Sequence, residues 1–454
     1  MIEKGFSTCF FCIIHINQKT HDSTKFFLQD LHALGVAMEI RRDLYLNRLI
    51  RRKHNGLIKV ITGMRRCGKS FLLFRLFKRH LLECGIPETH IIDIAFDAYE
   101  NAPLRNPTAL LEALNSRLTD SDPYYVLLDE VQLLDSFADV LNSLIRRPNI
   151  DVYVTGSNAR FLSKDVITEF RGRGDPVHMH PLSFAEFMSV YDGERQSGWN
   201  EYLLYGGLPL ILSFTEPEDK SNYLKFLFRE TYLSDIVNRH SIRHREEFED
   251  LIRILASGIG ALTNPAKLSA TFKSVKKKTL SPVTIKNYID YLEDAFVLTG
   301  ARRFDIKGKK YINTPLKYYF SDSGLRNALL NFRQIEETHS LENIVFNELI
   351  MRGYNVDVGL IEQAERNKKG EYSRNRLEID FVCNQGSERY YIQVAYNLPT
   401  PEKKHQEERP LLLLRDGFKR IMITKGFPAP HYNDQGVLFM DLFDFLLDSD
   451  SLRR

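Results

Sequence analysis

The chain has 454 residues, of which 43% are hydrophobic and 27% are charged, and its mean hydropathy is -0.30. This composition is typical of a globular protein, and the length exceeds one ordinary core, so we expect two to four domains. No run of about 18 apolar residues occurs, so no transmembrane helix is expected. The formal net charge of +3 is too small to indicate a partner before it is mapped along the chain.

The five cysteines are an odd, sparse set that does not make a disulfide framework, which favours a reducing cytoplasm. Cys9 and Cys12 form a single CxxC pair with no second pair nearby, so a four-ligand zinc site is not expected. Residues 1–37 show no sustained periodicity, whereas Met38 begins an amphipathic helical pattern. We interpret 1–37 as a leader that is disordered or comes from a misassigned start.

From Leu57 onward the pattern alternates between strand and helix. Apolar, β-rich runs predict strands at Leu57–Thr62, His90–Phe96, Tyr124–Leu128, Asp151–Thr155 and Pro176–Met179. Helical patterns lie between them, at Lys69–Glu83, Pro107–Leu118, Ser136–Arg146 and Asn158–Thr168. Continuous apolar strands that alternate with helices predict a parallel sheet covered on both faces.

The segment Gly63 to Ser70, GMRRCGKS, matches the P-loop pattern GxxxxGK[ST] in full, with a predicted strand before it and a predicted helix after it. The glycines let backbone N–H groups curl around phosphate oxygens at the positive end of the helix. We expect Lys69 to neutralise phosphate charge and Ser70 to supply a hydroxyl to Mg²⁺. The predicted nucleotide-binding residues are Gly63, Arg66, Cys67, Gly68, Lys69, Ser70 and Phe71.

Two acidic residues, Asp129 and Glu130, end the predicted strand Tyr124–Leu128. In a parallel sheet this end lies beside the P-loop, so Asp129 is expected to hold Mg²⁺ and Glu130 to act as general base toward water. The alternative is a strand that ends in a polar turn. No [NT]KxD stretch that would read guanine occurs, which favours ATP over GTP.

Weaker candidates follow the next strand. Asn158, with Ser157 as second candidate, is predicted to contact the γ-phosphate or to orient water, although a helix cap explains Asn158 equally well. Arg173, with Arg171 as second choice, is predicted to act as an arginine finger in a neighbouring subunit, which implies a homo-oligomer. The alternative is a pair of arginines on a solvated loop.

These motifs together resemble a known family. GMRRCGKS, YYVLLDEVQ, YVTGSN, GRG followed by PLSFAEF, and then YGGLP are similar to bacterial and archaeal AAA-type ATPases with a C-terminal domain of unknown function. The resemblance runs from about Glu39 to the end of the chain. It implies ATP binding and hydrolysis with Mg²⁺, and it leaves the physiological task open.

The middle of the chain is mostly helical and locally basic. Ser281 and Pro282 are an N-cap and first-turn pair before a helix, and strand-like pieces follow it, an order that resembles a winged helix. The segment 267–310 carries eleven Lys or Arg and four Asp or Glu, a net of +7, and includes Lys276, Lys277 and Lys278. This charge suits a DNA backbone. The alternatives are a solvated basic loop and a wing that packs against an acidic neighbour.

The last predicted unit resembles the PD-(D/E)XK nuclease fold. Glu342, Asp380 and Gln393 match its metal-binding positions, but the lysine position of that fold holds Ala395. Lys403 or Lys404 on the next helix could substitute. We predict a unit that keeps this fold without cleavage activity and that serves as a binding or assembly surface.

The sequence therefore predicts a multidomain α/β protein in four segments. They are a leader at 1–37, a P-loop AAA-type ATPase domain at 38–195, a helical and winged-helix region at 196–335, and a nuclease-like α/β domain at 336–454. The expected function is Mg²⁺-dependent ATP hydrolysis coupled to DNA binding or remodelling in the cytoplasm, without a membrane. The alternative is an ATP-dependent switch that binds a protein partner through its C-terminal unit.

Overall fold

The computed structural model describes residues 39–156, 170, 172–333, 335–366, 372–426 and 429–453. The predictions made for the leader 1–37, for Ser157 and Asn158 and for Arg171 lie outside these residues. Arg42–Arg454 forms one compact unit, and in the preceding unit the described residues 39–41 belong to neither helix nor strand. Within the described ranges, no helix is long and apolar enough to cross a membrane.

The first sheet is five-stranded and parallel, with the strand order β2-β3-β4-β1-β5. Its strands are β1 (Ile58–Gly63), β2 (Ile91–Ala95), β3 (Tyr124–Asp129), β4 (Ile150–Thr155) and β5 (Gly174–Met179). Every residue of β1, β3 and β4 is buried, which explains their continuous apolar sequences. This is the sheet of a P-loop NTPase, as predicted.

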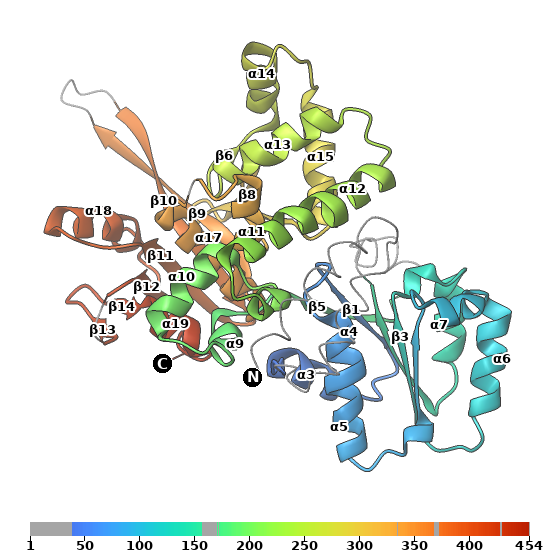
Figure 1. The fold of residues 1–454 in the computed structure, drawn as a ribbon. Helices are drawn as coiled ribbons and strands as arrows, with labels where there is room; N and C mark the ends of the chain where they lie inside the picture. The colour runs from blue at the N-terminus through green and yellow to red at the C-terminus, as the bar shows by residue number, and fades with distance from the viewer. Residues whose placement is uncertain are drawn as a thin grey trace, which may run out of the picture. The chain divides into compact units, whose positions relative to one another are not determined.

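Helices cover both faces of this sheet, as Figure 1 shows. On one face, α6 and α7 pack through a cluster that includes Leu110, Leu141 and Val126. On the other face, α3 and the long helix after the P-loop pack against Ile61 and Tyr153. The helical segments of this part are α3 (Asp43–Ile50), α4 (Lys69–Phe71), η1 (Leu72–Phe77), α5 (Lys78–Glu83), η2 (Glu88–His90), η3 (Tyr99–Arg105), α6 (Pro107–Arg117), η4 (Val131–Leu133) and α7 (Phe137–Leu144).

A helical region follows the first sheet. Its helices are α9 (Phe184–Met188), α10 (Arg195–Tyr205), η6 (Pro209–Ser213), α11 (Pro217–Phe226), η7 (Leu227–Leu233), α12 (Ser234–Arg239), α13 (Arg245–Ser257), α14 (Pro265–Val275), α15 (Pro282–Asp294) and α16 (Ser323–Leu329). Ser281 caps α15 by accepting a hydrogen bond from the Thr284 N–H, as its sequence predicted. Sequence reasoning missed α14, which begins with Asn264 as N-cap and Pro265 in its first turn.

The second sheet is nine-stranded, in the order β13-β14-β12-β11-β10-β9-β7-β8-β6. Its strands are β6 (Leu262–Thr263), β7 (Leu298–Asp305), β8 (Lys310–Phe320), β9 (Asn355–Arg366), β10 (Tyr372–Gln385), β11 (Glu388–Ala395), β12 (Lys419–Thr424), β13 (His431–Tyr432) and β14 (Val437–Asp441). Helices α17 (Glu337–Met351), α18 (Pro401–Leu412) and α19 (Leu442–Leu447) complete this part.

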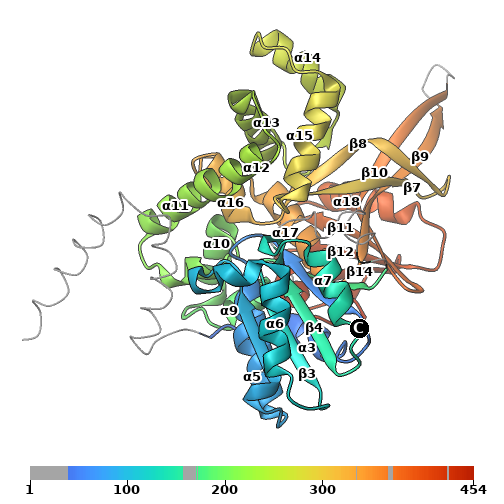
Figure 2. The same cartoon turned by 90° about the vertical axis from the view of Figure 1, so that its right-hand side faces the viewer.

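The second sheet crosses the boundary that we expected between residues 335 and 336. Strand β7 of the helical region pairs in parallel with β9, and Arg303 lies opposite Val358. Strand β7 lies between β9 and β8 in the sheet and also contacts α15, and Figure 2 shows these elements together. The helical region and the C-terminal part therefore share one hydrogen-bonded sheet, which local sequence patterns could not indicate.

Candidate nucleotide-binding site

The P-loop lies at the carboxyl end of β1, and its shape requires glycine. Gly63 has φ +143°, and a Cβ there would lie 2.0 Å from the carbonyl oxygen of Met179 on β5. Gly68 has φ +99° and caps α4, while Arg66 also adopts a positive φ of 65°. Positive φ at these three positions bends the loop backbone into a conformation that glycine adopts at little cost, which is what the glycine positions of the motif provide.

Lys69 is buried, with 5% of its surface exposed, and its ammonium donates hydrogen bonds inside the loop. The acceptors are the carbonyl oxygens of Gly63 at 3.0 Å and of Met64 at 2.8 Å. Lys69 and Ser70 begin α4, and Ser70 is exposed. Of the other predicted loop residues, Arg66 is exposed, Cys67 is buried and Phe71 packs partly against the core.

Asp129 is the last residue of β3 and Glu130 follows it, at the same end of the sheet as the P-loop. Asp129 is 4% exposed, and burial raises the pKa of its carboxyl, while hydrogen bonds from the Thr155 and Ser70 hydroxyls oppose that rise. The Ser70 contact brings together the two residues predicted to hold Mg²⁺. Glu130 has a left-handed φ of 52°, and its carboxylate accepts a hydrogen bond from the amide of Gln132.

Thr155, at the end of β4, contacts both acidic residues. Its hydroxyl donates to the Asp129 carboxylate and accepts a hydrogen bond of 3.0 Å from the Glu130 N–H. Sequence reasoning placed candidates two and three residues later, at Ser157 and Asn158, and missed Thr155. The available signal was a polar residue that ends an apolar strand next to the strand of Asp129.

Arg173 lies at the amino ends of the strands, whereas the P-loop of the same chain lies at their carboxyl ends. It immediately precedes β5, whose Gly174 pairs with Ile58 and whose Met179 pairs with Gly63. The backbone is held at both sides, because Arg173 donates to the Phe170 carbonyl and accepts from the Ile58 N–H at 2.8 Å. Six strand residues at about 3.3 Å each separate it from the loop by roughly 20 Å. Arg173 therefore cannot serve the site of its own chain.

Comparisons with known proteins place the chain in a family. Residues 55–188 match the model of an AAA domain, and residues 196–336 match a domain of unknown function. An uncharacterized protein of Haemophilus influenzae is 35% identical over 414 residues, covering 90% of this chain and 98% of the relative. The chain belongs to this family of AAA-type P-loop ATPases. A second relative, an uncharacterized protein of Methanocaldococcus jannaschii, is 28% identical over 429 residues, covering 90% of this chain and 88% of the relative.

Solved structures resemble this AAA-type ATPase only distantly. The Orc1 protein of Aeropyrum pernix in complex with DNA is 12% identical, with a TM-score of 0.26, and the match covers 64% of this chain and 92% of that one. DnaA from Aquifex aeolicus, bound to AMPPCP, is 11% identical, with a TM-score of 0.25 and coverages of 55% and 85%.

The YGGLP motif of the ATPase forms a turn around a buried carboxylate. Asp322 accepts a hydrogen bond of 2.8 Å from the Gly207 N–H and one of 2.9 Å from the Leu325 N–H. A Cβ on Gly206 would lie 2.4 Å from that carboxylate, and one on Gly207 would lie 2.4 Å from the Leu182 carbonyl oxygen. Because the Leu182 N–H also donates to Gly207, this turn ties the PLSFAEF segment to α16.

Several lysines of the basic segment 267–310 are paired with acidic residues. Lys276 lies 3.0 Å from the Asp250 carboxylate of α13, and Lys278 lies 2.8 Å from that of Glu246. Lys286 on α15 pairs with Asp290. The exposed cations at the other end of the segment lie on the β7–β8 hairpin: Arg302, Lys307, Lys309 and Lys310.

The C-terminal acidic residues surround a lysine that sequence reasoning did not consider. The ammonium of Lys317, on β8, lies 2.9 Å from Glu342 and 2.7 Å from Glu378. Burial opposes the charge of Lys317, but the neighbouring carboxylates outweigh it and raise its pKa. Burial, together with Glu342, raises the pKa of Asp380 well above its usual value. The available signal was a lysine within the apolar strand pattern PLKYYF.

The two lysines proposed to substitute at position 395 have other partners. Lys403 pairs with Glu407, which also accepts a hydrogen bond of 3.3 Å from the Gln393 amide. The Lys404 ammonium lies 4.4 Å from the centroid of the Phe439 ring. Among the described side chains, Glu342, Glu378 and Asp380 do not bring their oxygens close enough together to form a three-ligand metal group.

Proposed function

We propose that this protein binds ATP with Mg²⁺ at the P-loop and hydrolyses it. One observation carries the proposal: Lys69 and Ser70 begin the helix that follows the P-loop and β1, and the buried Asp129 ends the parallel strand β3, where the nearby Ser70 hydroxyl lowers its pKa. A P-loop, a lysine ammonium and a buried carboxylate are the groups that phosphate and Mg²⁺ require. The lack of a guanine-reading [NT]KxD stretch favours ATP over GTP.

The side chains present fit this substrate. Entering phosphates would take over the Lys69 ammonium, which now binds loop carbonyls. Ser70 and Asp129 would hold Mg²⁺, which supplies positive charge to the phosphate oxygens when it is bound. Glu130, held by Gln132 and through its own N–H by Thr155, would accept a proton from the attacking water.

We infer that hydrolysis takes place in an oligomer and is coupled to DNA. Arg173 lies too far from the P-loop of its own chain, so the site that it can serve is the P-loop of a neighbouring subunit. The order α13–β6–α14–α15–β7–β8, in which β6 pairs with β8, supports the proposal that this region is a winged helix with the β7–β8 hairpin as its wing. The free cysteines Cys67, Cys84 and Cys383 are consistent with the cytoplasm that we propose.

The charge distribution favours the hairpin, rather than α15, as the DNA contact. Lys276, Lys278 and Lys286 have acidic partners within 3.0 Å, so much of their field is neutralised. Lys307, Lys309 and Lys310 are exposed around a tight turn, in which Asp305 accepts a hydrogen bond from the Gly308 N–H. Phosphate contacts of this kind need no base recognition, so the proposal is binding without strong sequence preference.

Salt dependence of DNA binding tests this assignment. Anisotropy of a labelled duplex should give a slope of log affinity against log salt that falls by about 0.9 for each phosphate that the protein no longer neutralises. Replacement of Lys307, Lys309 and Lys310 by Gln should therefore flatten the slope by up to about 2.7. The matched control replaces the paired lysines Lys276, Lys278 and Lys286 by Gln, which should change the slope by less than half as much.

The alternative function is an ATP-dependent switch that binds a protein partner. The paired lysines Lys276 and Lys278, between α14 and α15, favour it, because with their acidic partners they form a mixed-charge surface rather than a basic one. ATP turnover that DNA leaves unchanged, with DNA affinity equal in both lysine triple variants, would select this alternative. DNA-stimulated turnover with a steep salt dependence would select the first proposal.

A further inference from the structure

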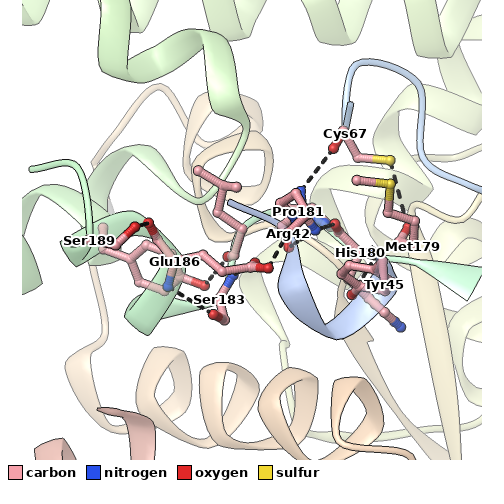
Figure 3. A network of polar contacts seen from close by, with 11 residues as sticks. Arg42, Tyr45, Cys67, Met179, His180, Pro181, Ser183, Glu186 and Ser189 are labelled. Carbon is pink, nitrogen blue, oxygen red and sulfur yellow. Dashed lines mark hydrogen bonds and ion pairs between the residues drawn. The ribbon is translucent and has the colours of Figure 1, made fainter. Parts of the chain in front are cut away.

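Arg42 is a buried arginine that lies outside both the P-loop motif and the matched AAA domain. It immediately precedes α3, and 2% of its surface is exposed. Its guanidinium donates to the carbonyl oxygens of Cys67 at 3.0 Å and of His180 at 2.6 Å, and it forms an ion pair of 3.0 Å with Glu186 (Figure 3). The acceptors thus come from the P-loop, from the end of β5 and from α9.

Glu186 supplies the counter-charge that a buried guanidinium requires, and it is held in place itself. Its second carboxylate oxygen accepts a hydrogen bond of 2.9 Å from the Ser183 N–H, and the Ser183 hydroxyl accepts one of 3.0 Å from the Glu186 N–H. This capping box begins α9 within the PLSFAEF motif. Figure 3 shows Glu186 between Ser183 and Arg42. Neither partner of the ion pair can rotate away without loss of other hydrogen bonds.

The contact with Cys67 bears on phosphate binding through the geometry of the peptide unit. In a trans peptide, the carbonyl of one residue and the N–H of the next point in opposite directions from one plane. A guanidinium that holds the Cys67 oxygen therefore fixes the direction of the Gly68 N–H. Gly68, the N-cap of α4, adopts φ +99°. Because glycine has no Cβ, its own side chain does not restrict the orientation of this peptide.

We propose that Arg42, held by Glu186, is a positioning residue that orients the Cys67–Gly68 peptide so that the Gly68 N–H faces the nucleotide phosphates. The inference rests on the proposed ATP binding and adds to it a role for the PLSFAEF motif. The planar guanidinium, with several donors in a fixed fork, suits this task, whereas a lysine ammonium can replace only part of the set. Arg42 touches the loop backbone from outside and acts on the substrate through it.

The test measures nucleotide affinity and fold stability in the full-length protein. The variants are Arg42→Gln, Arg42→Lys and Glu186→Gln, and the matched control is Arg352→Lys. Arg352 also forms a close ion pair with a buried glutamate, Glu348, at 2.7 Å and donates to a backbone carbonyl, that of Phe445, but its contacts lie in the C-terminal part. Binding of a fluorescent ATP analogue with Mg²⁺, steady-state turnover and thermal unfolding without nucleotide are compared.

Arg42→Gln should weaken binding of the analogue roughly tenfold, the size expected for loss of one charge-assisted hydrogen bond. Arg42→Lys should recover part of that loss, and Arg352→Lys should bind the analogue as tightly as wild type even where its unfolding temperature falls. Glu186→Gln combined with Arg42→Gln should cost less than the sum of the two, because both remove one interaction.

Two results would overturn the inference in distinguishable ways. If Arg42→Lys, Glu186→Gln and Arg352→Lys all fold and all bind the analogue as tightly as wild type, Arg42 has no positioning role. That result would leave the proposed ATP binding intact. Wild type that binds the analogue no better than Lys69→Ala would remove the proposed ATP binding and this inference with it. If Arg42→Gln does not fold, Arg42→Lys and Glu186→Gln carry the comparison.

Discussion

The Thr155 hydroxyl donates a hydrogen bond to the buried Asp129 carboxylate, from the neighbouring strand of the parallel sheet. The same oxygen accepts the Glu130 N–H at 3.0 Å, so a single side chain positions both acidic residues that end β3. Because burial raises the pKa of Asp129 and this hydrogen bond opposes the rise, Thr155 helps to keep the carboxylate ionised for a metal.

Replacement of Thr155 by Val, which keeps the shape and removes the hydroxyl, should lower ATP turnover about tenfold, the effect of losing one hydrogen bond to a charged group. The pKa of Asp129 should rise further, so the acidic limb of the pH–rate profile should move to higher pH. Thr155→Ser should restore both properties. A Val variant with an unchanged profile and rate would show that Thr155 has no part in the chemistry.

Lys69 and Glu130 separate binding from hydrolysis. Lys69→Ala should abolish nucleotide binding, because the phosphates lose their main side-chain counter-charge. Glu130→Gln should bind ATP with Mg²⁺ but turn it over at least about 10²-fold more slowly, the usual scale for loss of a general base. Equilibrium binding and phosphate release measure the two effects. Near-normal turnover in Glu130→Gln would remove this residue from the mechanism.

The position of Arg173 predicts nucleotide-binding sites that are shared between subunits. Activity per subunit should rise with protein concentration, and a mixture of Arg173→Ala and Lys69→Ala subunits should recover turnover that neither variant has alone. Recovery follows because each variant leaves intact the half of a shared site that the other lacks. Phosphate release across a range of mixing ratios measures it. Activity that is independent of concentration, with no recovery on mixing, would favour arginines on a solvated loop.

His178, on β5, predicts a loss of stability in acid. Burial, the charge of Lys69 and the charge of Arg48 lower its pKa from 6.5 to about 4. Between these values the unfolded chain binds more protons, so stability present above pH 6.5 falls as the pH decreases toward 4. The loss is at most about 3 kcal/mol, and His178→Gln should remove it. Chemical denaturation of wild type and of His178→Gln at several pH values measures this loss. Free energies of unfolding that depend equally on pH in the two proteins would contradict the prediction.

The C-terminal acidic cluster predicts no nuclease activity. The Lys317 ammonium already lies between the carboxylates of Glu342 and Glu378, and Ala395 cannot orient water or offset charge on a phosphorane. Supercoiled, linear and branched DNA should remain intact with Mg²⁺ or Mn²⁺, with or without ATP. Nicking by wild type that disappears in Asp380→Ala would contradict the prediction, and loss of that nicking in Lys317→Met would identify the lysine that the sequence pattern lacks.

Local sequence was sufficient for the P-loop and for the strands around it. Gly63 and Gly68 adopt positive φ values that favour glycine, and Lys69 and Ser70 follow at fixed spacing, so one short segment contains every residue of the motif. The position of Asp129 was predictable for a similar reason. The carboxyl end of a buried strand in a parallel sheet lies at the end of the sheet where ligands bind. The cap of α15 at Ser281 also depends on adjacent residues alone.

What only the tertiary structure decided were contacts between residues far apart in the chain. Arg42 reaches Glu186, Lys317 reaches Glu342, and Lys278 reaches Glu246, at sequence separations for which no periodicity or spacing exists. The sequence alone does not show whether a charged side chain is solvated or buried. The role of that side chain depends on the partner that the fold places beside it. Arg42 lies in the amphipathic pattern that begins at Met38, which does not indicate its burial, and the fold buries it because Glu186 and backbone carbonyls satisfy its charge.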